Sequence, residues 1–137
     1  MRKDSRPLVL LVDDHADYLE VLEIGLRAEY SVIVAQNGLD GYALACRERP
    51  DAIVIDLMMP TIDGWTVLRK LRVNPELTDT PVIVITAVDR NTIKRTAAHF
   101  QVAGILQKPC TADDVAAAVR AALESARPRA AEADPRR

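Results

Sequence analysis

The chain has no apolar segment long enough to cross a bilayer, because its longest apolar runs, such as Leu8–Val12, span only a few residues. The start, residues 1–7, also lacks the long apolar stretch of a signal peptide. From these two absences we expect a cytoplasmic protein with no membrane attachment.

Cysteine is scarce, and an excess of charge of one sign is missing. Cys46 and Cys110 lie far apart in the sequence, which argues against a metal or redox pair and favours small core residues. The 18 basic and 20 acidic residues are interspersed and give a net charge of -2. No chain-wide field therefore attracts nucleic acid or an anionic membrane, and partners have to be inferred from a local site.

The sequence does contain enough apolar residues for one compact domain, with 49% hydrophobic residues in a chain of 137. Five short runs are rich in Val and Ile and mostly do not alternate with polar residues, which is typical of strands covered on both faces. The runs are Leu8–Val12, Val32–Ala35, Ala52–Ile55, Val82–Ile85 and, more weakly, Val102–Leu106.

Segments with helical spacing follow each run. Strand and helix thus alternate five times, which predicts an α/β fold: a doubly wound, five-stranded parallel sheet with five helices. The apolar positions expected to face the sheet are Leu19, Leu22 and Leu26; Leu39, Tyr42, Ala43 and Cys46; Gly64, Leu68 and Leu71; Ile93, Ala97 and Phe100; and Val115, Val119, Ala122 and Leu123.

Local punctuation sets the expected boundaries. Asn37 and Asp63, each before a glycine, and Thr111 are expected at helix starts. Pro128 is expected to end the last helix within a residue or two of Ala126. We therefore predict an N-terminal extension over 1–7, one domain over 8–126, and a flexible Arg/Ala/Pro-rich tail over 127–137.

Polar side chains follow four of the five predicted strands. In a flavodoxin-like sheet of order 2-1-3-4-5 the first and third strands are neighbours, so Asp13, Asp14 and Asp56 are expected side by side at the carboxyl edge. Carboxylates that close repel one another unless a cation lies among them. Oxygen ligands without cysteine favour a hard ion, and Mg²⁺ suits a few carboxylates and waters best.

Thr86 and Lys108 arrive at the same edge from the fourth and fifth strands. A hydroxyl, an ammonium and a divalent cation around one carboxylate can stabilise the oxygens of a transferring phosphoryl group. Asp56 is then the candidate nucleophile, forming an aspartyl-phosphate.

Four stretches together, "VLLVDDHADYLEVL", "DAIVIDLMMPTIDGW", "PVIVITA" and "ILQKP", resemble the receiver domains of two-component response regulators, similar to those of the chemotaxis response regulators. The resemblance covers about residues 8 to 125. It implies that Asp56 is phosphorylated by a histidine kinase or phosphotransfer protein.

The resemblance also assigns roles to the other residues at the edge. Asp13, Asp14 and Asp56, with the backbone carbonyl of Met58, are expected to hold Mg²⁺. Thr86 and Lys108 are expected to respond to the phosphoryl group, and the bond before Pro109 is expected to be cis.

One position departs from the family pattern, and two others affect the lifetime of the phosphoryl group. Ile105 stands where receivers carry a Tyr or Phe that swings inward on switching, and a β-branched aliphatic side chain has few rotamers to switch between. Met58 and Val88 occupy the positions that tune loss of the phosphoryl group, and neither can orient an attacking water. We therefore expect an aspartyl-phosphate that is not rapidly self-hydrolysed.

The leading hypothesis is a phosphorylation-activated module that signals by protein contact, and not an enzyme beyond self-catalysed phosphoryl transfer and dephosphorylation. Its expected partners are the phosphodonor, a downstream target or an output domain outside this chain, and a second copy in a phosphorylation-dependent dimer; direct nucleic-acid binding is not expected. A phosphorylation-independent receiver-like adaptor is the alternative. A phosphatase or flavoprotein is disfavoured by Met58, where a second acid is needed, and by the glycine-free loop after Val12.

His15, beside the acidic pair, is expected to begin the first helix with its ring near solvent rather than to ligate a metal, because imidazole suits softer ions.

Overall fold

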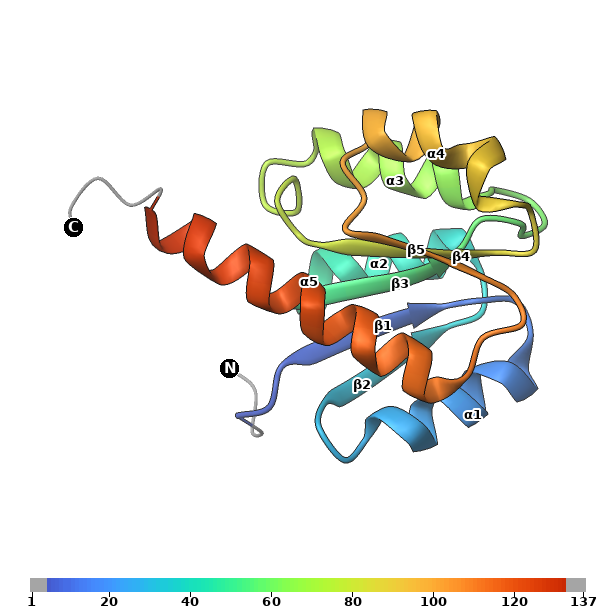
Figure 1. Cartoon of the computed structure of the whole chain (residues 1–137), viewed down its shortest axis with the longest axis horizontal. Helices are drawn as coiled ribbons and strands as arrows, with labels where there is room; N and C mark the ends of the chain where they lie inside the picture. The colour runs from blue at the N-terminus through green and yellow to red at the C-terminus, as the bar shows by residue number, and fades with distance from the viewer. Residues whose placement is uncertain (1–4, 133–137) are drawn as a thin grey trace.

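The computed structural model describes residues 5–132, in which five strands alternate with five helices (Figure 1). The elements are β1 (Leu8–Val12), α1 (Ala16–Leu26), β2 (Ser31–Ala35), α2 (Gly38–Glu48), β3 (Ala52–Asp56), α3 (Gly64–Val73), β4 (Val82–Thr86), α4 (Arg90–His99), β5 (Gly104–Gln107) and α5 (Ala112–Glu132). Within residues 5–132, no helix combines the length and apolar character needed to span a bilayer.

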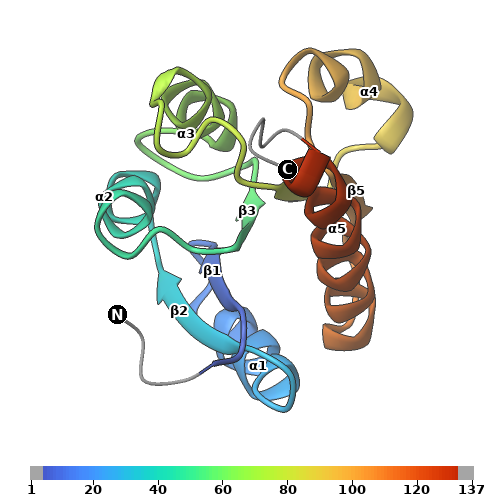
Figure 2. The same cartoon turned by 90° about the vertical axis from the view of Figure 1, so that its left-hand side faces the viewer.

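The strands form one parallel sheet of order β2-β1-β3-β4-β5, which confirms the predicted topology. Helices α1 and α5 cover one face of the sheet, and α2, α3 and α4 cover the other (Figure 2). Because all strands run in the same direction, the residues that follow them meet at one edge. The order of the sheet reverses beside β1, so β1 and β3 deliver their carboxyl ends next to each other.

The core consists of two apolar layers separated by the sheet. Every residue of β1, β3 and β4 is buried, as expected for strands covered on both faces. The outer strands are less covered: the first four residues of β2 and the first three of β5 are only partly buried. The central strands therefore form the rigid part of the sheet, and they also carry Asp13, Asp56 and Thr86 at their ends.

Helix α2 presents the predicted face only in part: Tyr42 and Cys46 pack against the core, but Leu39 and Ala43 do not. Its buried residues are Gly38, Gly41 and Ala45, whereas Leu39 is 57% exposed and Ala43 is also exposed. The reason is steric, because a Cβ at Gly41 would lie 2.9 Å from a methyl carbon of Val12. Small residues let this helix approach the strand closely, and apolar periodicity alone does not reveal that constraint.

The prediction that Pro128 ends the last helix near Ala126 is wrong, since α5 continues to Glu132. A proline inside a helix removes one hydrogen bond, that to the carbonyl four residues earlier. Here that carbonyl belongs to the exposed residue Glu124, where water can satisfy it. Residues 1–4 of the predicted extension and 133–137 of the predicted tail lie outside the described residues.

Side chains cap three helices at the positions predicted. Asn37 accepts the amide of Asp40 at 2.8 Å, and Asp63 accepts the amide of Thr66 at 2.9 Å. Thr111 forms a reciprocal capping box with Asp114, with donor–acceptor distances of 3.1 and 2.9 Å. These caps fix where α2, α3 and α5 begin, and hence the loops at the carboxyl edge.

Gly64 is expected to be the least replaceable glycine beside that edge. A Cβ there would lie 2.8 Å from the carbonyl oxygen of Asp56 and 2.8 Å from the Cα of Leu57, which are backbone atoms that cannot rotate away. We predict that Gly64→Ala lowers the free energy of unfolding by about 1–3 kcal/mol, measured by urea denaturation.

Gly104→Ala is the matched control, because a Cβ at Gly104 would meet Ile83 at an ordinary 3.7 Å. It should change the free energy of unfolding by less than about 1 kcal/mol. Equal destabilisation by the two substitutions would contradict the steric account.

Candidate functional site

Two buried carboxylates meet at the carboxyl edge of the sheet. Asp13 directly follows β1 and Asp56 is the last residue of β3, and both are only 3% exposed. They lie together because β1 and β3 are hydrogen-bonded neighbours, with Val12 opposite Ile55. Burying two like charges is unfavourable unless a cation compensates them.

Lys108 supplies a positive charge at this point. Its Nζ lies 3.1 Å from Asp13 Oδ2 and 3.2 Å from Asp56 Oδ2, so one ammonium bridges both carboxylates. The same Nζ lies 5.1 Å from the centre of the Tyr18 ring, a favourable cation–π position. The peptide bond between Lys108 and Pro109 is cis, as predicted.

The electrostatics of the three groups are linked. Burial raises the pKa of Asp56, and the charge of Asp13 adds to that rise, while the Met58 amide and the Lys108 ammonium oppose it. For Lys108, burial alone would lower the pKa, but the combined hydrogen bonds and charges of Asp13 and Asp56 outweigh it, so the pKa is raised. Lys108 therefore remains an ammonium, and the ionised Asp56 depends on it.

The donor set at the edge fits a hard cation. One ligand atom from each of Asp13, Asp14, His15 and Asp56 lies within 4.8 Å of the others. Among the residues the structure describes, Asp14 Oδ1 is the buried side-chain oxygen that accepts no hydrogen bond, although His15 Nδ1 lies 3.3 Å away. Buried polar atoms normally have a hydrogen-bond partner, so an oxygen without one is suited to bind a metal ion. Three carboxylates fit Mg²⁺ in particular.

His15 occupies the N-cap of α1 with its side chain 63% exposed, which agrees with the prediction that it begins the helix near solvent. Its Nδ1 lies 2.9 Å from Asp13 Oδ1. A hydrogen bond to Asp13 and the charge of Asp14 raise the pKa of the imidazole. The imidazole ring therefore interacts with both carboxylates of the acidic pair, Asp13 and Asp14.

The remaining predicted residues come from β4 and β5. Thr86 is the last residue of β4, Val88 lies in the loop after it, and Ile105 lies within β5. The Thr86 side chain is fully buried, and its hydroxyl accepts the amide of Val88 at 3.0 Å rather than contacting Asp56. Val88 and Ile105 are partly buried and pack against the same apolar layer. Of the predicted switch residues, Thr86 is thus held by the loop that follows it, and Ile105 lies on the neighbouring strand opposite Val84.

Met58 contributes its backbone and exposes its side chain. Its amide donates to Asp56 Oδ1 at 3.0 Å, and its side chain is 62% exposed. The adjacent loop is fixed by the amide of Gly64, which donates to the Leu57 carbonyl at 3.1 Å. Each Asp56 oxygen therefore already has one donor, the Met58 amide or the Lys108 ammonium.

Tyr18 also belongs to the site, although the sequence did not predict it. Its hydroxyl donates to the Cys110 carbonyl at 3.0 Å and lies 3.1 Å from the Cys110 sulfur, which ties α1 to the turn before α5. Burial, followed by the contact with Cys110, raises the pKa of this phenol. With His15, Lys108 and Pro109 these residues line an open cavity of about 420 Å³ beside the carboxylates. The signal available in the sequence was an aromatic residue one turn after the acidic pair.

Residues 9–120 match the family model described as the response regulator receiver domain. The chain is 36% identical over 118 residues to the DNA-binding dual master transcriptional regulator RpaA of Synechocystis, covering 85% of this chain and 49% of RpaA. It is 35% identical over 121 residues to the response regulator MprA of Mycobacterium leprae, covering 88% of this chain and 52% of MprA. The chain thus spans about half the length of these relatives.

Solved structures share the fold. The receiver domain of a Francisella response regulator superposes with a TM-score of 0.80 at 28% identity, covering 88% of this chain and 98% of that one. The chemotaxis protein CheY4 of Vibrio cholerae gives a TM-score of 0.81 at 24% identity, covering 86% and 99%, and shows similarity of fold alone.

Asp56→Asn is expected to stabilise the protein at neutral pH in buffer without divalent cations. Burial raises the pKa of Asp56, so the folded protein favours the protonated carboxyl. The stability that this preference contributes is fully present below the unfolded-state pKa of the group. It is lost as pH rises through the higher folded-state pKa, because the carboxyl must then ionise while buried. The difference in free energy of urea unfolding between Asp56→Asn and wild type should therefore widen between about pH 3.5 and pH 7.

Asp63→Asn is the control, because asparagine caps α3 as well as aspartate does. It should follow the wild type across the same pH range. A difference for Asp56→Asn that shrinks as pH rises would contradict the assignment of burial as the dominant influence on Asp56.

Proposed function

We propose that this chain, which belongs to the family of response regulator receiver domains, accepts a phosphoryl group on Asp56 and signals by protein contact. The general role of the family is phosphorylation-activated signalling. The observation that carries the proposal is the geometry of Asp56: a buried carboxylate at the end of a central strand, with Lys108 Nζ 3.2 Å from one oxygen. Structural carboxylates seldom need such an arrangement.

In the proposed transfer, one Asp56 oxygen attacks phosphorus while the bond from phosphorus to the donor breaks. With a phosphohistidine donor the imidazole leaves with the bonding electrons, and a new O–P bond forms on Asp56. The Met58 amide and Lys108 are close enough to hydrogen-bond oxygens of the product, because both already donate to Asp56.

Receiver domains bind Mg²⁺ at an acidic cluster. In this chain we assign the ligands to Asp13, Asp14, Asp56 and the backbone carbonyl of Met58. The cation would offset the negative charge that collects on the phosphoryl oxygens. The oxygen that supports this assignment is Asp14 Oδ1, which is buried and accepts no hydrogen bond and is therefore available to a cation.

Thr86 and Lys108 are the groups proposed to respond to phosphorylation. Once Asp56 is phosphorylated, its carboxyl oxygens lose their negative charge to the phosphoryl group, so the bridge from Lys108 to Asp13 and Asp56 has to rearrange. If the Thr86 hydroxyl turns to the phosphoryl group, it releases the Val88 amide that it now accepts. The change is then passed to the start of α4 without the aromatic rotation that Ile105 cannot provide.

The partners proposed are a histidine kinase or phosphotransfer protein upstream and a protein target or an output domain downstream. Receiver domains in general interact with histidine kinases and output domains. The chain spans about half the length of RpaA and MprA. An output domain that follows the receiver is therefore proposed only as one of the possible downstream partners. A phosphorylation-dependent dimer is also compatible with it.

The alternative is an adaptor of the same fold that is never phosphorylated. Ile105 favours it, since the usual aromatic readout is absent at that position. The phosphorylated module is favoured by five residues that an adaptor has no need to keep together: Asp13, Asp14, Asp56, Thr86 and Lys108.

Incubation with Mg²⁺ and acetyl phosphate is expected to add the mass of one phosphoryl group to the wild-type protein. The gain should disappear in Asp56→Asn and after chelation of Mg²⁺, and intact-protein mass spectrometry measures it. If neither acetyl phosphate nor a panel of histidine kinases gives a mass gain in a folded protein, the adaptor becomes the better description. Turnover of a phosphate ester would instead indicate a phosphatase.

Polar residues at the two tuning positions should speed loss of the phosphoryl group. Met58 is exposed at the mouth of the site and Val88 is half-buried beside Thr86, so Met58→Asn with Val88→Glu places groups that can orient water near Asp56. We expect dephosphorylation of the double variant at least severalfold faster than wild type, followed by mass spectrometry after donor removal. Met58→Leu is the control, and equal rates in all three proteins would reject this role.

A further inference from the structure

The charges of this chain are divided unevenly among its helices. Helices α3 and α4 carry six of the 18 Lys and Arg residues and no Asp or Glu. The rest of the chain therefore holds twelve basic residues against all 20 acidic ones. The two helices lie next to each other on the same face of the sheet (Figures 1 and 2). A protein with a net charge of -2 thus has one strongly positive face.

Five of the six cations on this face form no hydrogen bond or ion pair within the described residues. Among the Lys and Arg side chains within residues 5–126, those that make no hydrogen bond or ion pair are Arg69, Lys70, Arg90, Lys94 and Arg95, and Lys70 lies over the Tyr42 ring. Elsewhere cations are paired, as in Arg27 with Glu23, Arg49 with Glu76 and Arg120 with Glu29. Unpaired charges gathered on two adjacent helices are available to an external anionic group.

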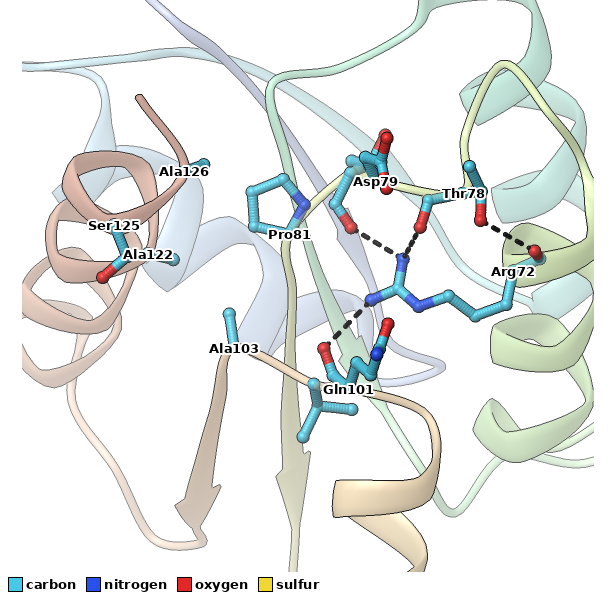
Figure 3. A pocket seen from close by; sticks show the side chains of 11 residues that line it. Arg72, Thr78, Asp79, Pro81, Gln101, Ala103, Ala122, Ser125 and Ala126 are labelled. Carbon is cyan, nitrogen blue, oxygen red and sulfur yellow. Dashed lines mark hydrogen bonds between the residues drawn. The ribbon is translucent and has the colours of Figure 1, made fainter. Parts of the chain in front are cut away.

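Arg72 belongs to the same helix but is already used. Its guanidinium donates to the carbonyls of Phe100, Thr78, Thr80 and Gln101 at distances from 2.9 to 3.4 Å. Figure 3 shows this side chain in a cavity of about 330 Å³, where its bonds join the segment before β4 to the turn after α4. The charge of Asp79 also acts on this guanidinium, so the positive charge open to a partner at the groove comes from Arg69 and Arg95 rather than from Arg72.

A groove runs between α3 and α4 on the outer side of Arg72. It encloses about 490 Å³ and is lined by Arg69, Arg72, Val73, Thr78, His99, Phe100 and Gln101. Arg95 lies on the same side of α4 as His99, one turn earlier. The apolar part comes from Val73, 76% exposed, and from Phe100, whose ring stacks on Trp65. The groove therefore has both apolar and cationic residues in its lining, with Arg95 close by on α4.

We propose that this groove docks an acidic segment of a partner protein, with an apolar side chain on Val73 and Phe100 and carboxylates beside Arg69 and Arg95. Mixed apolar and charged contacts of this kind are typical of peptide recognition in a groove. Among the described residues of α4 no large hydrophobic side chain is exposed, which disfavours insertion into a membrane. The Phe100 ring stacks on Trp65 and meets the His99 ring edge to face, so only its remaining, partly exposed surface is open to an apolar side chain of the partner.

The docking surface goes beyond the proposed phosphoryl transfer, because none of its residues contacts Asp56. Asp56→Asn should bind the same segments as wild type. A failure of phosphorylation and a failure of docking are therefore separate results.

Selection of random 12-residue peptides displayed on phage against the immobilised full chain tests the chemistry of the partner directly. We expect the enriched peptides to contain several Asp or Glu residues with at least one large apolar residue. Enriched peptides that are neutral or basic would overturn the proposal, as would enrichment no greater than on a blank surface.

Three substitutions make the same change in net charge: Arg69→Glu, Arg95→Glu and Lys94→Glu. The last is the control, because Lys94 lies about 140° around α4 from His99 and so points away from the groove. Titration of one selected, fluorescein-labelled peptide should show at least tenfold weaker binding to Arg69→Glu and Arg95→Glu and less than threefold weakening with Lys94→Glu. Equal weakening by all three would indicate unspecific charge attraction. Circular dichroism verifies that each variant is folded.

Competition identifies the other possible occupants. Tighter binding of a DNA duplex or of phosphatidylglycerol vesicles than of the peptide, lost in Arg69→Glu, would assign the groove to that polyanion and overturn the protein partner.

Discussion

The bridge from Lys108 to Asp13 and Asp56 is the interaction on which the arrangement of this molecule depends. Two carboxylates, each 3% exposed, lie next to each other, and burying two acids so close together is unfavourable without the ammonium that lies within 3.2 Å of both. The sheet topology brings the aspartates together from β1 and β3, and the turn after β5 brings the lysine. The carboxyl edge is therefore held at a balance of charges that covalent modification of Asp56 can upset.

The strands and the residues at their ends were predictable because both follow from local pattern and simple geometry. Val- and Ile-rich runs identify buried parallel strands, and parallel strands must end at a common edge, so Asp56, Thr86 and Lys108 could be brought together without coordinates. The caps at Asn37, Asp63 and Thr111 were predictable for the same reason, since capping is a local hydrogen bond.

Features that depend on contacts between distant segments were not predictable in this way. Leu39 was expected to face the sheet, but the close approach of α2 to Val12 leaves room there only for Gly41 and similarly small residues. Pro128 was expected to end α5, yet the helix continues where solvent can satisfy its carbonyls. Tyr18 was missed because its partner, Cys110, is brought to it only by the fold. The groove between α3 and α4 likewise requires knowing which helices are neighbours.

The hydrogen bonds of Arg72 also have a mechanical consequence. They tie the C-terminal end of α4 to α3 and to the segment before β4, while Trp65 stacks on Phe100 at the same end. Eight of the ten residues of α4 are exposed, and the helix is otherwise anchored by the buried residues Ile93 and Ala97. These contacts hold the C-terminal end of α4 in place. A displacement of the Thr86–Val88 loop would reach the opposite end of the helix first, so it would move the N-terminal turn of α4 further than the end held by Arg72.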